Sequence, residues 1–219
     1  LRTGYLDTEQ LLTGGRAAAS VFIVVSVLLA LLTLFYTVES LVREQRCGLD
    51  GIARAAAVPT AGVLAGKAVA NAVLAMLIVA CAAVAILITL LVQRFQTGIA
   101  IPLDMPAVLL ILGLLVAPTI IVWTSFVTFL VATVRNRFAV YGIALAALAV
   151  TGLANNFGWL NWLTSWYLGG QALVWSDLDR LASMWSAIVA NRLVMLSLAV
   201  SLIAITLTIW PGRLPDIRA

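Results

Sequence analysis

The chain has 219 residues, of which 63% are hydrophobic and only 10% are charged, and its formal net charge is +4. Soluble domains have roughly 25% charged residues, so a soluble protein of this composition could not cover its surface with polar groups. We therefore expect a polytopic membrane protein, and so small a charge does not indicate nucleic-acid binding. The chain contains no histidine, which removes the commonest general base and metal ligand. No catalytic residue, metal site or cofactor of its own is predicted.

Five apolar runs are long enough, or nearly so, to cross roughly 30 Å of hydrocarbon as helices. Helices are required because an open strand or loop leaves its backbone unpaired in lipid. The predicted spans are about residues 17–42, 63–92, 106–134, 138–154 and 193–210. None has an Asp, Glu, Lys or Arg in its middle, and Pro118 is expected to bend the third. The predicted fold is all-α, a single transmembrane helical bundle over residues 1–219.

One dense island of charge separates the first two apolar runs. Residues 39–67 carry seven of the chain's 22 charged residues (13 basic and 9 acidic), whereas residues 17–38 and 68–93 carry none. We expect an elbow at residues 43–62 that lies at the membrane surface and is held at both ends by long apolar helices.

Within this elbow, Gly48 is a natural stop for the first helix, and Pro59 ends a short amphipathic helix at about residues 49–58. Asp50 and Arg54 stand four apart on the polar face of that helix, where they can pair. An ordinary cytosolic loop is one interpretation of this pattern. The other is a docking element, on which a soluble partner presses and so tilts both long helices.

Basic residues near the span ends indicate which end faces the cytosol. If the elbow is cytosolic, eight Lys and Arg residues lie inside, namely Arg43, Arg46, Arg54, Lys67, Arg135, Arg137, Arg213 and Arg218. Five lie outside, namely Arg2, Arg16, Arg94, Arg180 and Arg192. We therefore expect the elbow and the C-terminus in the cytosol. A chain that starts outside, with Leu1 rather than Met, needs a preceding helix, so six spans are expected in the complete unit.

Residues 155–191 contain five of the seven tryptophans: Trp159, Trp162, Trp166, Trp175 and Trp185. Indole rings prefer the membrane–water interface. We expect an outer segment of short interfacial or re-entrant helices with these rings as an interfacial belt, although the segment could also line a path for a hydrophobic substrate.

The stretch from Leu34 to Leu74 resembles the second helix, coupling elbow and third helix of type-2 ABC exporter permeases. The features that carry the resemblance are Phe35-Tyr36, Glu39, Arg43-Glu44, Pro59 and Gly66-Lys67. The break "VRNRFAVYG" at residues 134–142 is similar to the family's cytosolic turn between the fourth and fifth helices. The Trp-rich segment resembles the outer re-entrant hairpin before the last helix.

The resemblance implies a permease that forms the membrane pathway, while a partner ATPase subunit or domain binds ATP and Mg. The expected contacts with that ATPase are Arg43, Glu44, Arg46, Leu49, Asp50, Ile52 and Arg54. A second permease half, as a homodimer or tandem repeat, would complete the pathway for export of a hydrophobic or amphipathic cargo. The expected location is the inner (plasma) membrane of a bacterium. Alternatives are an ion-coupled secondary transporter and a non-transporting membrane assembly subunit.

Overall fold

The computed structural model describes residues 14–47, 60–97, 105–134, 136–159, 161, 163, 165–166 and 184–210. Across these residues all regular structure is helical. Within these ranges, five helices or helical stretches are long and apolar enough to cross a membrane, namely Val25–Arg43, Gly62–Thr89, Val108–Thr133, Arg137–Ala154 and Trp185–Ile209. The described part of the chain is therefore all-helical, as predicted, and its long apolar helices are those of a membrane protein.

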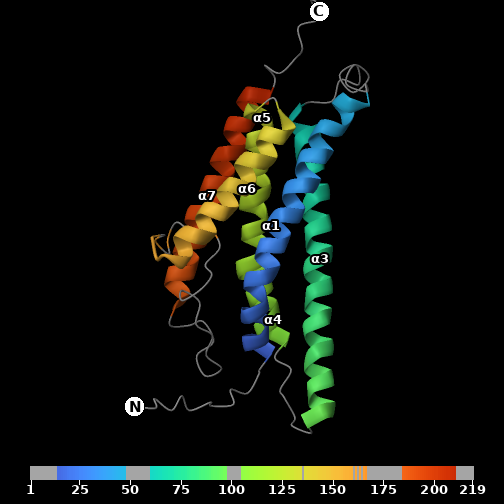
Figure 1. Ribbon diagram of the computed structural model, residues 1–219, viewed down its shortest axis with the longest axis vertical. Coiled ribbons are helices and arrows are strands. Elements are labelled where there is room, and N and C mark those ends of the chain that lie inside the picture. The colour runs from blue at the N-terminus through green and yellow to red at the C-terminus, as the bar shows by residue number, and fades with distance from the viewer. Residues whose placement is uncertain are drawn as a thin grey trace, which may run out of the picture.

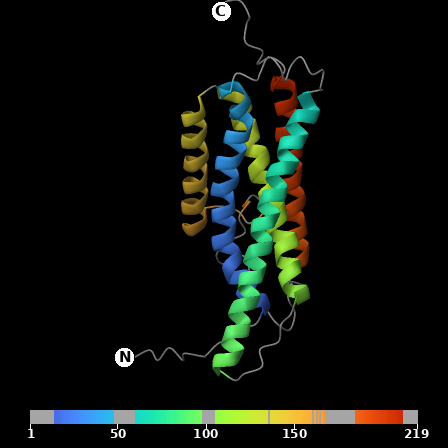
Figure 2. The same ribbon diagram turned by 90° about the vertical axis from the view of Figure 1, so that its right-hand side faces the viewer.

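The first two helices are the longest and lie side by side (Figures 1 and 2). Helix α1 runs over Gly14–Arg46 and helix α3 over Thr60–Thr97. At 1.5 Å per residue they are about 50 and 57 Å long, whereas the hydrocarbon core is roughly 30 Å thick. Both helices must therefore extend past the hydrocarbon, as the charges toward the end of α1 require.

The third span is one helical rod with an irregular turn in it. Helix α4 (Met105–Ile111) leads into a π-helical turn, η1 (Leu112–Val116), and then into α5 (Ala117–Thr133). The Ala117 N–H donates to the carbonyl of Leu112, five residues back. Pro118 follows directly; it has no N–H, and its ring would collide with the carbonyl four residues earlier in a regular helix. The wider turn gives the proline room, so the irregularity expected at Pro118 lies in the turn just before it.

Of the last two helices, only the first has bounds close to those of its predicted span. Helix α6 (Arg137–Asn156) matches the span expected at 138–154 closely. Helix α7 covers Trp185–Ile209, so the start predicted at residue 193 was wrong, and the connecting segment is shorter than 155–191. The error has a physical cause: Asn191 and Arg192 read as solvent-exposed polar residues, but both are buried inside the helix.

Helix α5 is the centre of the bundle and contacts both α1 and α7. In the apolar 18-residue stretch of the third span 56% of residues are buried, against 12% in that of the second and 11% in that of the fourth. An apolar cluster, here called the elbow-side core, joins α1, α3, α5 and α6; it includes Leu34, Val38, Leu64, Trp123, Val127, Leu130 and Val140. The exposed faces of α3 and α6 remain apolar, as lipid-facing helices must.

The helix ends sort into two groups. The end of α1 at Arg46, the start of α3 at Thr60, the α5–α6 turn and the end of α7 at Ile209 all lie at one end of the bundle (Figure 1). We call this the elbow end, because the chain between Cys47 and Thr60 must begin and finish there. The start of α1 and the end of α3 lie at the other end (Figure 2).

Candidate functional site

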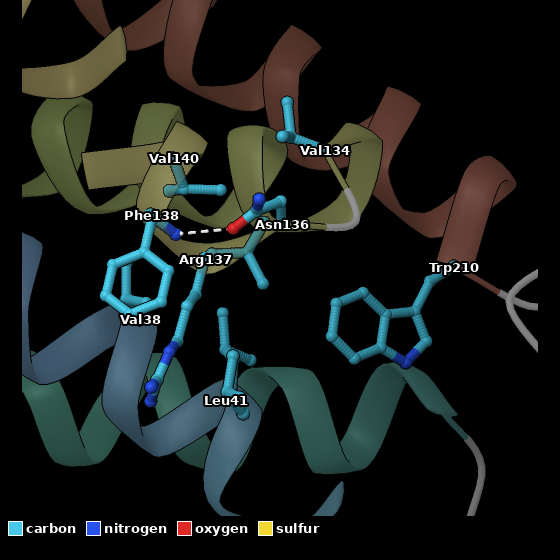
Figure 3. Close-up of a pocket in the computed structure, with 10 residues that line it drawn as sticks. Val38, Leu41, Val134, Asn136, Arg137, Phe138, Val140 and Trp210 are labelled. Atoms are coloured by element: carbon cyan, nitrogen blue, oxygen red, sulfur yellow. Dashed lines mark hydrogen bonds between the residues drawn. The ribbon is translucent and has the colours of Figure 1, made fainter. Parts of the chain in front are cut away.

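A cavity of about 390 Å³ opens at the elbow end (Figure 3). It is lined by residues of α1, α5, the α5–α6 turn, α6 and the end of α7: Val38, Leu41, Val42, Val131, Val134, Asn136, Arg137, Phe138, Val140 and Trp210. Most of these side chains are apolar. The Trp210 indole faces the cavity from α7, and the Arg137 side chain extends toward α1 (Figure 3). Four spans, α1, α5, α6 and α7, therefore meet around one space at this end.

Local hydrogen bonds define the α5–α6 turn. Helix α5 ends at Thr133, and Val134 takes an extended backbone conformation. The Asn136 side-chain oxygen accepts a hydrogen bond from the Phe138 N–H at 2.9 Å, the usual capping bond at a helix start. The Arg137 guanidinium lies over the Phe138 ring at 4.5 Å from its centroid, a cation–π contact that fixes the arginine at the cavity mouth.

Polar and aromatic contacts tie the end of α1 to its neighbours. Asn71 of α3 is buried, and its side-chain Nδ2 donates to Thr37 Oγ1 at 3.2 Å and to Ser40 Oγ at 3.4 Å. The rings of Phe35 and Tyr141 lie 5.3 Å apart, joining α1 to α6. A displacement of the end of α1 would therefore be transmitted to both α3 and α6.

The predicted ATPase contacts are only partly within the described chain. Arg43 is exposed on the last turn of α1, and the backbones of Glu44 and Arg46 continue that helix to its end. Leu49, Asp50, Ile52 and Arg54 lie outside the described residues, and so does the amphipathic helix expected around them. Cys47, just after α1, is exposed and free.

The tryptophans of the predicted belt occupy different environments. Trp159 is 80% exposed and stacks on Phe157 with ring centroids 5.3 Å apart. Trp185 is about half exposed at the first position of α7. Trp166 instead packs inward, with its ring 5.2 Å from Trp123 of α5. Trp162 and Trp175 are not among the residues that the structure describes.

A second cluster of polar contacts, which we call the polar junction, lies where residues 163–166 meet α5 and α7. Asn191 is fully buried, and its Nδ2 donates to the carbonyls of Leu163 at 2.9 Å and Ser165 at 3.0 Å. The Thr119 hydroxyl lies 3.2 Å from the Trp166 carbonyl and 2.8 Å from that of Leu115, and can donate to either. These side chains satisfy backbone that is not helical, as a segment enclosed between spans requires.

Arg192 completes the polar junction and is 4% exposed. Its Nη1 donates to Thr119 Oγ1 and to the Trp166 carbonyl, both at 3.4 Å. Its Nε and Nη2 are buried, and among the described residues neither has a hydrogen-bond partner.

The sequence interpretation missed this site, because it placed Arg192 outside the membrane and found no charge within a span. A usable signal was present. Residues 188, 192, 195 and 199 repeat at helical spacing and are all buried, so Arg192 falls on the packed stripe of an otherwise apolar helix.

Within the described part of the chain, no group of three or more His, Cys, Asp or Glu side chains could hold a metal ion. No protein-family model matches the chain, and no curated protein or solved structure matches it either.

Proposed function

We propose that this chain is the permease subunit or domain of an ABC exporter, in which a partner ATPase drives movement of the membrane helices. The observation that supports this most is the arrangement of the elbow end. Two helices that are longer than the membrane core reach the two ends of the elbow, and the α5–α6 turn and the end of α7 lie beside them. Force applied to the elbow would pass directly into the bundle.

The proposed route of the force follows the contacts of α1. The elbow-side core joins α1 to α5 and α6, and Asn71 joins α1 to α3. Close packing transmits displacement because protein interiors are hardly compressible. ATP and Mg would be bound by the ATPase, which would contact the elbow through Arg43, Glu44, Arg46, Leu49, Asp50, Ile52 and Arg54. A second permease half would cover the exposed apolar surface and enclose the pathway.

The cargo in this proposal is hydrophobic or amphipathic, and the membrane is the bacterial inner membrane. Ion-coupled carriers usually place charged residues within their spans, and Arg192 removes the argument that this chain has none. The energy source separates the two mechanisms. An ABC permease moves cargo only with its ATPase and ATP, whereas a carrier works with an ion gradient alone.

A charge exchange in the elbow tests the proposal. The double variant Asp50→Arg/Arg54→Glu keeps the net charge but reverses the pattern that the ATPase would contact. We expect loss of ATPase co-purification, or of cargo-stimulated ATP hydrolysis, with membrane insertion unchanged. Arg94→Glu, near the far end of α3, is the control, because it reverses a charge away from the elbow. Unaltered co-purification and coupling in the elbow variant would refute the docking role.

A further inference from the structure

Arg192 is a buried arginine within a membrane span. It lies about 10 Å along α7 from the first residue of the helix, well inside the stretch Trp185–Ile209 that is long and apolar enough to cross the bilayer. Charged groups at such depths are costly, and they persist where they pair or where they serve transport. An arginine in this position therefore requires a group that balances its charge.

The described contacts leave most of this charge unbalanced. Arg192 Nη1 has two neutral acceptors, the Thr119 hydroxyl and the Trp166 carbonyl, and both are at the long distance of 3.4 Å. Nε and Nη2 together carry three N–H donors that have no acceptor among the described residues. A buried guanidinium is stable when a carboxylate or phosphate takes such donors, often two at once.

No carboxylate in the described part of the chain is near enough to do so. The acids there are Glu39 and Glu44, toward the elbow end of α1. Trp210, which lines the elbow-end cavity together with Val38 and Leu41, is about 27 Å from Arg192 along the axis of α7. The two glutamates are therefore at the far side of the bundle from the guanidinium.

The groups around Arg192 add further donors. The Ser165 hydroxyl and the Trp123 Nε1 are buried without a partner among the described residues. Trp123 is four residues after Thr119 on α5, and its ring packs on Trp166, so it lies where the elbow-side core adjoins the junction. Unused N–H and O–H donors beside an arginine favour a ligand that brings several acceptor oxygens and a negative charge.

The outer surface beside the junction is apolar. Leu193 is 64% exposed, Leu198 46% and Val194 39% on α7, and Ile121 of α5 is 47% exposed. A molecule with a hydrocarbon tail could lie along these side chains in the lipid while its head reached the junction. Access of this kind would come from the membrane side and would not require a water-filled route.

We propose that Arg192 is the binding site for the anionic group, a phosphate or carboxylate, of an amphipathic molecule that enters between α5 and α7 from the lipid. The Arg192 fork takes two oxygens through Nε and Nη2, and Ser165 and Trp123 supply further donors. Thr119 and the Trp166 carbonyl hold Nη1 and so orient the fork. The binding itself does not depend on the ATPase; that the bound molecule is the exported cargo rests on the proposed function.

The probe is phosphatidylglycerol, with phosphatidylcholine as the zwitterionic comparison. The purified full chain is exchanged into detergent containing equal amounts of the two lipids, and retained lipid is counted by native mass spectrometry. We expect preferential retention of phosphatidylglycerol, reduced about tenfold or more in Arg192→Gln, because charge-assisted paired hydrogen bonds are lost. Arg192→Lys should retain an intermediate amount, since it keeps the charge but not the fork. Arg94→Gln should behave as the unaltered chain.

Inorganic phosphate separates the two sources of the anion. Displacement of the retained lipid by millimolar phosphate would support a site that recognises a free anion, and resistance to displacement would support a site for an anionic lipid or lipid-like molecule. Equal retention of the two lipids by the unaltered chain would overturn the proposal, and that comparison needs no variant to fold. It would also be overturned if only the variant Asp177→Asn/Asp179→Asn retained phosphatidylglycerol, because a carboxylate of the chain would then balance Arg192. Either result leaves the elbow experiment unaffected.

Discussion

The elbow end and the polar junction place their polar side chains in opposite environments. At the elbow end, charged residues such as Arg43 are exposed, and the helices beneath are held by apolar side chains around Leu34 and Val127. At the polar junction, Asn191 and Arg192 are buried, and they hold backbone that no helix satisfies. In a bilayer, apolar packing gives little driving force beyond close fit, whereas an unpaired polar group is costly. Polar contacts should therefore matter more for stability at the junction than at the elbow.

The largest expected effect is at the junction. Asn191→Ala removes the donor that two carbonyls share, the part-buried one of Leu163 and the buried one of Ser165. Leaving buried acceptors unpaired should lower the free energy of unfolding by about 2–3 kcal/mol, measured by SDS titration in mixed micelles. Ser197→Ala is the control on the same helix, because Ser197 is exposed and bonds only its own helix. A change in Asn191→Ala no greater than in Ser197→Ala would contradict the structural role given to the junction.

A smaller effect is expected in the elbow-side core. Leu34 is fully buried on α1, whereas Leu28 on the same helix is 58% exposed. Because lipid is as apolar as the bundle interior, Leu34→Ala loses packing contacts and leaves a cavity but pays little transfer cost. We expect about 1–2 kcal/mol of destabilisation for Leu34→Ala and less than half of that for Leu28→Ala, in the same titration. Equal effects would indicate that α1 is not packed as described.

The smallest effect is expected at the α5–α6 turn. Asn136→Ala removes the cap that accepts from the Phe138 N–H and should cost about 1 kcal/mol. Asn136→Asp restores an acceptor at the same place and should recover most of that stability. If the aspartate and alanine variants unfold alike, the capping bond does not contribute.

Much of the fold could be predicted because membrane spans follow from apolar length. The spans at 17–42, 63–92, 106–134 and 138–154 all lie on helices, since in lipid only a helix satisfies such a run. The predicted start of the last span was wrong because hydropathy scores the polarity of a side chain and not the environment in which it lies. Asn191 and Arg192 are polar, but their partners are the carbonyls of a segment some 25 residues earlier, and local sequence cannot show such a contact.

Other details depend on how helices face each other. Asn71 pairs with Thr37 and Ser40 through the register of α1 and α3, which no spacing within either helix shows. Pro118 indicated an irregularity in the third span, but the sequence did not show that it would be a π-helical turn before the proline. The elbow charges could be predicted as an exposed group, and the exposure of Arg43 agrees with this, while the contacts of the elbow with an ATPase stay a prediction.

In the proposed function the elbow end faces the cytosol, where an ATPase can reach it. Cys47 is exposed there, and Cys81 lies within the second span, so Cys81→Ser leaves one reporter at the elbow. A membrane-impermeant maleimide should label Cys47 in inverted vesicles and leave it unlabelled in right-side-out vesicles. Labelling in right-side-out vesicles alone would place the elbow outside and contradict the account.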